Sequence, residues 1–577
     1  MKLLNLLLFF SAAIAMADMN MDDNEEMEHM DHQDLEPTTS ESTNSTESLE
    51  PIPHVMKHAH GVPILQTHLL PEERLYWENY NTTTYFTVES KHRPALYLHI
   101  ISGLLAVFVI YPISLIFNNL NMGKSYLSTL LVHSSTILFS LLNYSIFINS
   151  IPELYPGNAY NTMIIILFVT TILQLIFAFI KNIDPGQPNR SDYFELHASS
   201  ANTSDEEEEE ERDTLVGGGI SEKSRFPQLQ SRIMKFRTWV SGTIFYKISS
   251  IGFNLLNWGH FFYYMILVPT GVATFCIYGQ EKAVFNLLAH FIKGGVFFAY
   301  GILSLSRYCG GFTNKGWAWN HKFIDRTKSQ STWFSLQNKG LWTMEMIESS
   351  LILFYGSTNI FLEHLSNAGA EWSPKDLQHV SIAFIFIGCG LCGVITEMKL
   401  QDWRYEQAIA DLEKVNGGNG DDTQDVSNII KASPGFSPNP FPIVTIYWTG
   451  YLMSKHQQAS SLSTEIHIQW GNMFVMGCAF RFITYLLMLL NSKTPKELTG
   501  PSRPITELIV SFSLMCGGLI FMELTDPVVL SFEYYGLTSM FTLNLSLGVT
   551  TLLMGWQMLL FAFKDWLKNK YAKQDIV

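Results

Sequence analysis

Long apolar blocks separated by polar stretches run along most of the 577-residue chain. The block ALYLHIISGLLAVFVIYPISLIF has about the length that a helix needs to cross a bilayer, roughly 20 residues. Such blocks lie at 95–117, 125–149, 159–181, 249–270, 283–305, 341–361, 377–396, 440–453, 468–490, 504–523 and 537–563. Because only helices and closed barrels satisfy their backbone groups in lipid, the pattern predicts an all-α integral membrane protein. We expect a helical bundle of about eleven transmembrane helices.

The chain begins with the pattern of a secretory signal peptide. MKLLNLLLFFSAAIAMA has one lysine, a short apolar core and small residues ending at Ala17. We therefore expect residues 1–17 to be cleaved. Residues 18–90 are polar and lack hydrophobic periodicity, which predicts a disordered luminal tail. Asn44 and Asn81 begin Asn-X-Ser/Thr sequences in this tail and are expected to be glycosylated.

Loop charge gives a second criterion for orientation, because cytoplasmic loops collect Lys and Arg. Loop 306–340 carries six basic residues against one acidic residue, whereas loops 150–158 and 524–536 contain no Lys or Arg. Together with the signal peptide, this predicts a luminal or extracellular N-terminus and a cytoplasmic C-terminus. The expected location is a membrane of the secretory and endomembrane system or the plasma membrane.

Two polar stretches interrupt the predicted spans: an acidic linker after the third span, and residues 401–439 within the second membrane domain. The expected order is a three-span N-terminal membrane domain (91–182), a disordered acidic cytoplasmic linker (183–248), an eight-span membrane domain (249–563) and a cytoplasmic tail (564–577). Much of the net charge of −15 lies in the N-terminal tail and in TSDEEEEEERD within the linker. A nucleic-acid partner would require a basic face instead, so the expected partner is the lipid bilayer.

Several phrases in the second membrane domain resemble those of a known family. YGSTNIFLEHL, DLQHVSIAFIFIGCGLCG, MSKHQQ, EIHIQWG and RPITELIVSFSLMCGGLIFM resemble the C-terminal domain of the fungal Ytp family of multi-pass membrane proteins. The first membrane domain, from HRPALYLHIISG to NSIPELYPGNAYNTM, looks like the domain of unknown function that precedes it in that family. That domain has been likened to cytochrome b561. The resemblance implies a membrane protein without an established activity.

The likeness to cytochrome b561 implies haem b held between paired histidines on neighbouring helices. By helix rise, His133 and His260 lie at similar depths, as do His260 and His290. His99 lies about 12 Å from the depth of His133, so these two cannot ligate one haem. Either of the first two pairs can be the axial ligands. The alternative is that these histidines make interhelical hydrogen bonds.

A second group of histidines lies at the luminal ends of four predicted spans. The candidate metal ligands are Glu363, His364, His379, His456 and His467. Three or four imidazoles with a carboxylate are sufficient to bind copper, zinc or iron. The alternative is that His and Glu residues occupy the interfacial zone without a ligand.

The sequence also places charge inside apolar blocks. Lys293 and Arg481 lie near the middle of their blocks, and Glu345 and Glu348 share one face of a third. Because charge in hydrocarbon is expensive, these residues are functional candidates. Glu348 and Arg481 lie at similar depth and are predicted to pair. The pair either lines a path for protons or a solute, or locks the helices together.

The stretch MADMNMDDNEEMEHMDHQD at 16–34 holds five methionines, two histidines and eight carboxylates. Thioethers favour Cu(I) and imidazoles Cu(II), so this tail can capture copper weakly. An ordinary solvated acidic tail has the same composition.

Three functional classes remain open. The first is a redox or metal-handling protein that uses haem or the luminal histidines. The second is a transporter or channel built on the intramembrane charges. The third is a structural or assembly protein without a ligand. No phosphate-binding loop, dinucleotide fingerprint or nucleophile elbow points to a particular enzyme class.

Overall fold

The computed structural model describes residues 61–181, 244–312, 317–319, 323–325, 342–362, 372, 374–415, 430–432, 438–458, 460–490 and 502–574. The chain divides into a unit of residues 1–50 and a unit of residues 51–577, and the second contains all of these residues. The predicted signal peptide, the methionine-rich stretch and most of the acidic linker lie outside the described residues.

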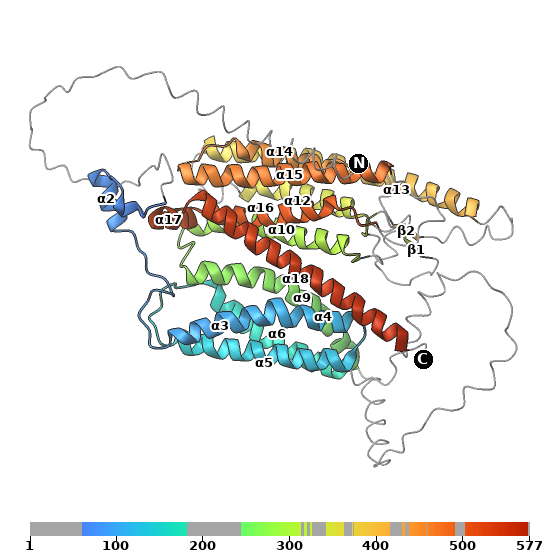
Figure 1. Cartoon of the computed structure of the whole chain (residues 1–577), viewed down its shortest axis with the longest axis horizontal. Coiled ribbons are helices and arrows are strands. Elements are labelled where there is room, and N and C mark those ends of the chain that lie inside the picture. The colour runs from blue at the N-terminus through green and yellow to red at the C-terminus, as the bar shows by residue number, and fades with distance from the viewer. Residues whose placement is uncertain are drawn as a thin grey trace, which may run out of the picture. The chain divides into compact units, whose positions relative to one another are not determined.

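The first helix group follows a short segment that holds η1 (Ile64–Gln66) and α2 (Pro71–Glu78). Its members are α3 (Arg93–Leu105), η2 (Ala106–Ile110), α4 (Tyr111–Asn119), α5 (Gly123–Ile148), α6 (Ala159–Lys181) and α9 (Ile244–Phe275). The segments α3, η2 and α4 form one continuous span, and α5 packs against this span and against α6 (Figure 1).

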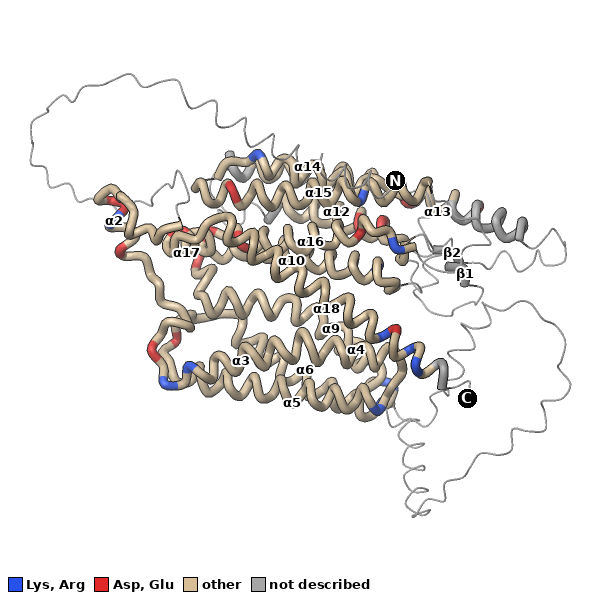
Figure 2. Tube along the Cα trace, in the orientation of Figure 1, with Lys and Arg blue, Asp and Glu red and all other residues tan. Residues whose placement is uncertain are grey.

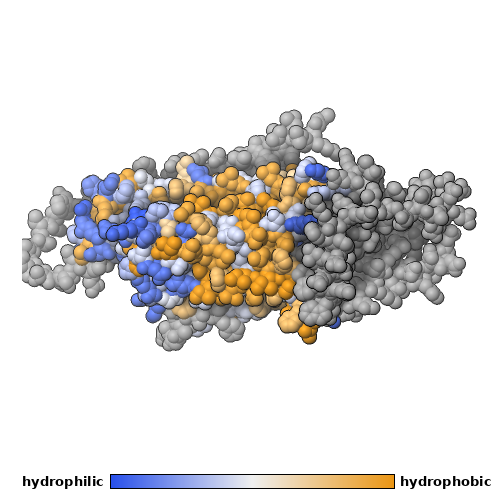
Figure 3. Space-filling view, turned by 90° about the horizontal axis from the view of Figure 1, so that it is seen from below, coloured by the Kyte–Doolittle hydropathy of each residue, from blue (hydrophilic) through white to orange (hydrophobic). Residues whose placement is uncertain are grey.

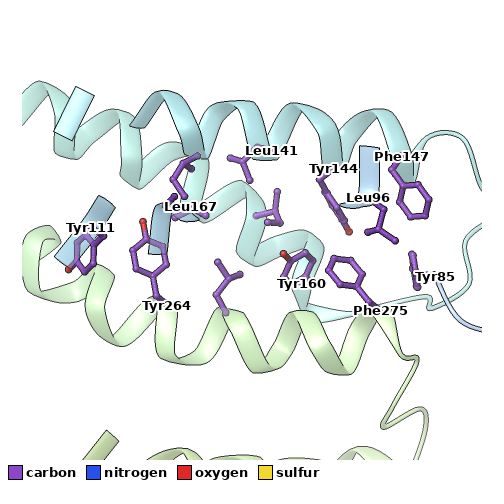
Figure 4. Close-up of a cluster of buried hydrophobic side chains, with 14 residues drawn as sticks. Tyr85, Leu96, Tyr111, Leu141, Tyr144, Phe147, Tyr160, Leu167, Tyr264 and Phe275 are labelled. Carbon is purple, nitrogen blue, oxygen red and sulfur yellow. The ribbon is translucent and has the colours of Figure 1, made fainter. Parts of the chain in front are cut away.

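Helix α9 follows the linker in sequence, yet it packs mainly against α6 of the first helix group. Tyr264, Leu267 and Phe275 of α9 share a buried core with aromatic and aliphatic residues of α3, α5 and α6 (Figure 4). Polar contacts also hold α9 there, since Asn257 accepts a hydrogen bond from the Tyr126 hydroxyl of α5 at 3.2 Å. From its position after the linker, the 249–270 block was predicted to belong to the second membrane domain. Its main contacts are instead with α6, so we describe α9 with the first helix group.

The second helix group contains α10 (Ala283–Tyr308), α12 (Met344–Leu362), α13 (Pro374–Val415), α14 (Phe441–Ser454), α15 (Ser461–Leu490), α16 (Thr506–Glu523), α17 (Asp526–Tyr535) and α18 (Ser539–Gln574). A short antiparallel pair, β1 (Phe323–Asp325) and β2 (Ile430–Ala432), joins two of its loops, with Phe323 opposite Ala432. The group is otherwise helical within the described residues.

Helix α16 is the central helix of the second helix group, since it packs extensively against both α10 and α15. Two glycines permit the close approach of α10 to α16. A Cβ atom at Gly294 would lie 2.6 Å from the Gly518 carbonyl oxygen, and a Cβ atom at Gly518 would lie 2.6 Å from the Gly294 carbonyl oxygen. Only glycine fits at both positions, as is common where membrane helices pack closely.

Eight helices within the described residues are long and apolar enough to cross a membrane. Their apolar middle is visible on one face in Figure 3, and most Lys, Arg, Asp and Glu positions lie toward helix ends in Figure 2. The other three predicted spans are the helices α9, α12 and α14, which do not meet this criterion. With 14 residues, α14 is about 21 Å long, shorter than the ~30 Å hydrocarbon core. The membrane class is confirmed, but the count of eleven is not.

Helix α18 contacts both helix groups (Figure 1). Pro112 lacks the N–H that a regular helix would direct to the Phe108 carbonyl, four residues earlier. The helix widens into the π-helical turn η2 there, as is common where the regular ladder is interrupted. The Trp556 indole of α18 donates a 2.7 Å hydrogen bond to this carbonyl. The next residue, Gln557, donates to the Ile302 carbonyl of α10 at 2.8 Å.

We predict that Trp556→Phe lowers the free energy of unfolding by about 1–3 kcal/mol, because the Phe108 carbonyl loses a donor in a region without water. Adding Pro112→Ala supplies an N–H in the regular helical position, so the double variant should recover part of the loss. Thermal unfolding in detergent micelles measures both effects. The matched control is Trp566→Phe, an exposed indole on the same helix, which should change stability little. Equal losses at positions 556 and 566 would contradict the bridging role.

Candidate functional site

Five charged side chains from four helices meet inside the second helix group. They are Arg307 on α10, Glu345 and Glu348 on α12, Arg481 on α15 and Glu507 on α16. None is more than 8% exposed. We refer to these five residues as the charge cluster.

Ion pairs join the members of the charge cluster across helices. Arg481 Nε lies 2.9 Å from Glu507 Oε1, and Arg481 Nη1 lies 3.8 Å from Glu348 Oε1. Arg307 Nη1 lies 3.9 Å from the same Glu348 oxygen. The Glu348 carboxylate therefore lies between two guanidinium groups. The contact of Glu348 with Arg481 that depth suggested is present, and Glu507 is the nearer partner of Arg481.

Hydroxyl groups supply hydrogen bonds to the carboxylates. The Tyr300 hydroxyl donates to Glu348, and the Thr484 hydroxyl donates to Glu507 Oε1 at 2.8 Å. The Thr484 and Thr506 hydroxyls lie 2.6 Å apart, so Thr506 can donate to Thr484 in turn. These bonds orient the carboxylates toward the arginines, and they offer exchangeable protons next to them.

Several polar atoms of this site have no hydrogen-bond partner within the described residues. They include both carboxylate oxygens of Glu345, both Nη atoms of Arg307 and the Tyr485 hydroxyl. The site thus contains buried donors and buried acceptors together. Three carboxyl groups face two guanidinium groups, and an isolated charge in this environment is expensive. Among these five residues there is one more carboxyl group than there are guanidinium groups, so a neutral cluster would carry one proton on a carboxyl group.

Lys293 is not part of the charge cluster. It lies 14 positions before Arg307 on α10, or about 21 Å along the helix axis. Its Nζ atom lies 5.9 Å from the centre of the Tyr355 ring on α12. The structure therefore separates this lysine from Glu345, Glu348 and Arg481, with which it was grouped as an intramembrane charge.

The predicted metal ligands are only partly brought together. The His379 and His456 rings are 6.2 Å apart, centre to centre. In contrast, His467 lies buried within α15, where its Nδ1 is 2.7 Å from the Ser463 carbonyl one turn earlier. Glu363 and His364 lie outside the described residues. No group of three His, Cys, Asp or Glu side chains suited to a metal ion occurs within the described part of the chain.

The histidines of the first helix group make interhelical hydrogen bonds. His133 Nε2 lies 3.0 Å from the Tyr264 hydroxyl. Both nitrogens of His260 are engaged by α6, Nδ1 with Gln174 at 2.8 Å and Nε2 with Thr170 at 2.9 Å. A haem ligand must offer one ring nitrogen to the iron. His260 has neither nitrogen left for this, whereas His133 Nδ1 has no hydrogen-bond partner within the described residues.

Tyrosine rings also fill the space between these histidines. The Tyr111 ring lies 5.6 Å from His133, and the Tyr264 ring lies 5.6 Å from His260, centre to centre. Figure 4 shows both tyrosines pointing into the space between the helices. His290 lies on α10 of the second helix group, with its ring 5.1 Å from Phe521. As arranged, these side chains do not fit a haem between paired histidines.

Of the two predicted glycosylation sites, Asn81 is described and Asn44 is not. Asn81 lies on the exposed stretch between α2 and α3, where its side-chain oxygen accepts a 2.9 Å hydrogen bond from the Thr83 backbone. Its exposure is compatible with modification, which stays a prediction.

The apolar helices and their buried polar contacts define a multi-pass helical membrane protein. Residues 263–565 match the family described as "Protein YTP1-like, C-terminal", and residues 79–184 match a "Domain of unknown function (DUF2427)". The chain belongs to the YTP1-like family, which confirms the resemblance noted from its sequence phrases.

Three curated proteins of fungi are similar to the chain. Uncharacterized membrane protein YCR061W of Saccharomyces cerevisiae is 39% identical over 90% of each chain. Uncharacterized membrane protein C3B8.06 of Schizosaccharomyces pombe is 34% identical over 52% of this chain and 56% of its own. Protein YTP1 of Saccharomyces cerevisiae is 23% identical over 54% and 52%, respectively. The first two names assign a membrane location, and none of the three names states an activity. No solved structure matches the chain.

We predict that Arg481→Gln lowers the free energy of unfolding by about 3–5 kcal/mol, because it leaves Glu507 and Glu348 without their nearest cation. Glu507→Gln in the same chain should recover part of this loss, so the two changes should be strongly non-additive. Unfolding of both single variants and the double variant in micelles gives the coupling.

The matched control for this cycle is Glu465→Gln, because Glu465 lies 16 positions earlier on α15 and accepts its hydrogen bond from Ser539 instead. Its effect should simply add to that of Arg481→Gln. If Glu507→Gln is equally additive, the 2.9 Å ion pair does not contribute to stability.

Proposed function

We propose that this chain is a membrane transport protein that binds and releases a proton at the charge cluster. The observation that carries the proposal is the excess of one carboxyl group over guanidinium groups in an enclosed site. A carboxyl group that has no cation of its own is neutral in this environment when it carries a proton, and it can release that proton when its surroundings change. A set of fully paired charges offers no such group.

Glu345 is the best candidate for the carboxyl group that carries the exchangeable proton. It is fully buried, and neither of its oxygens accepts a hydrogen bond within the described residues. It lies three positions before Glu348 on α12, so the two side chains share one face of the helix. Movement of α12 relative to α10 and α15 would change the distance of both carboxyl groups from the arginines.

Every titratable or charged group near this proton contributes to its affinity. Those facing the site are Arg307 and Tyr300 from α10, Glu348 from α12, Arg481, Cys478 and Tyr485 from α15, and Glu507 from α16. Because the guanidinium groups stay charged throughout the physiological range, the proton is exchanged among carboxyl groups.

The proton proposal is tested with purified protein in proteoliposomes that contain a pH-sensitive dye. An imposed potassium diffusion potential should drive proton movement faster than in protein-free vesicles, and Glu345→Gln should abolish the difference. Glu465→Gln, outside the charge cluster, should retain it. Infrared difference spectra recorded at two pH values should show a protonated carboxyl band that changes with pH and is absent in Glu345→Gln. A static lock would show neither proton movement nor a titrating band.

A second candidate function is weak metal binding at the opposite ends of the helices. The observation that favours it is the approach of His379 on α13 to His456 after α14. Neutral imidazoles are common ligands of zinc and copper. Metal content of the purified protein, measured before and after His379→Ala, distinguishes a bound ion from an interfacial histidine pair. The first helix group supplies no comparable observation for haem.

We also propose that the N-terminus is luminal and the C-terminus cytoplasmic, on the basis of loop charge and the signal-like start. Endoglycosidase treatment should increase the gel mobility of the protein through Asn44 or Asn81. Asn81→Gln should remove one shift and Asn44→Gln the other. A C-terminal tag that is protected from protease in sealed, cytoplasmic-side-out vesicles would overturn this orientation.

A further inference from the structure

A tryptophan covers the two arginines of the charge cluster. The Trp319 ring centre lies 4.1 Å from Arg307 Cζ and 4.9 Å from Arg481 Cζ. Trp319 is fully buried, although it lies in the connection between α10 and α12 and not in a helix. Its indole also packs with Tyr485 and Met488 of α15. The tryptophan therefore separates the arginines from the membrane face at which α10 ends and α12 begins.

The segment 317–319, which we refer to as the strap, is held by hydrogen bonds on both sides. Trp317 donates from its backbone N–H to the Phe312 carbonyl at 3.2 Å and from its indole to the Trp342 carbonyl at 3.0 Å. Arg307 Nε donates to the Trp317 carbonyl at 2.6 Å. The Ser502 backbone N–H donates to the Trp319 carbonyl at 2.7 Å. Extensive helix packing encloses the other sides of the charge cluster. The strap lies outside the helices, so its displacement breaks none of the backbone hydrogen bonds of α10, α12, α15 or α16.

Displacement of the strap would expose a site with strong preference for an oxyanion. Arg307 is fully buried, and neither of its Nη atoms donates a hydrogen bond within the described residues. The planar guanidinium fork matches the oxygen spacing of a carboxylate, phosphate or sulfonate group. Arg481 lies beside it under the same indole. Two guanidinium groups would therefore face an incoming ligand from the strap side.

The carboxyl groups make the binding of such an anion depend on protons. With one proton, the three carboxyl groups balance the two arginines, so an added anion requires an added proton. By linkage, the anion must then raise proton affinity by the same factor by which protons raise anion affinity. An anion and a proton would be bound together.

We propose that the charge cluster binds a small oxyanion between Arg307 and Arg481, and that Trp319 closes its access path from the strap side. This inference rests on the proposed function, since it identifies the ligand class that accompanies the proton. It adds Trp319 and Arg307 as residues that control access and charge selection.

Cys478 provides a native reporter for this path. It lies one turn before Arg481 on α15 and is buried, with its Sγ 3.6 Å from the Ile443 carbonyl. Ile443 also packs against the cluster that contains Trp319. The other five cysteines, Cys276, Cys309, Cys389, Cys392 and Cys516, are replaced by alanine. The rate of reaction of Cys478 is then measured with two thiosulfonate reagents of similar size, one carrying a sulfonate and one a quaternary ammonium group.

We expect Trp319→Ala to accelerate reaction at Cys478 at least about tenfold, with the sulfonate reagent favoured by about tenfold after correction for reaction with a free thiol. Inorganic phosphate should slow the sulfonate reagent in this variant. Trp319→Phe keeps an aromatic cover and should react slowly. Trp403→Ala, which removes an exposed tryptophan of α13, is the matched control and should leave the rate unchanged.

Arg307 is tested in the Trp319→Ala background. Arg307→Gln should remove the preference for the sulfonate reagent, whereas Arg307→Lys should keep it. Gel filtration and thermal unfolding confirm that each variant is folded. An unchanged rate in Trp319→Ala would overturn the role of Trp319, and a preference for the ammonium reagent would overturn the anion site. Labelling is measured in micelles without a proton gradient, so its failure is distinguishable from an absence of proton movement.

Discussion

The second helix group depends on the pairing of charges in a medium that offers neither water nor counter-ions. Arg481 can be buried in α15 because Glu507 of α16 and Glu348 of α12 lie within reach of its guanidinium group. Arg307 of α10 contacts the same Glu348 oxygen. Each of four helices therefore supplies a charge that would be costly without the others. This mutual requirement constrains the rotation and the depth of all four helices at once.

The first helix group obeys the same constraint with neutral groups. Its histidines, tyrosines and amides bond to one another across helices, as in the contact of His133 with Tyr264. At Pro112 the interruption of the helix leaves the Phe108 carbonyl to accept a bond from Trp556 of α18. These polar groups are thus bonded by neighbouring helices instead of by water. His133 Nδ1, Ser134 Oγ and Thr171 Oγ1 have no hydrogen-bond partner within the described residues. A histidine such as His260, whose two ring nitrogens both form hydrogen bonds with α6, connects helices and has no nitrogen available to a ligand.

The two helix groups differ in the charge of their buried polar side chains, and therefore in the ligands they can respond to. The hydrogen bonds of the first helix group join neutral side chains, so this network holds no excess charge. The charge cluster has an odd carboxyl group, and it has donors and acceptors that do not bond to one another. Such a site responds to protons and to ions. Trp319, supplied by a connection and not by a helix, covers it at one end.

Local hydropathy was sufficient to predict the membrane class and the extent of most helices, because the need to match a hydrocarbon layer acts on each segment separately. Depth along the helix also predicted the approach of Glu348 to Arg481. The count of eleven spans was not confirmed. Helix α14 is short for the hydrocarbon layer, and α9 and α12 are less apolar than the eight helices that meet the criterion. The family followed from several ordered phrases, not from the pattern of hydropathy.

Only the tertiary structure decided which charges meet. Arg307 was counted among the basic residues of loop 306–340, and Glu507 was not singled out from the sequence. Both are buried because α10 and α16 turn those positions inward. Lys293 looked equivalent to Arg481 but lies apart from the charge cluster, and α9 packs with helices that precede the linker. Sequence determines how deep a residue lies in the membrane. The rotation and tilt of each helix, set by contacts with distant segments, determine which residues share that depth as neighbours.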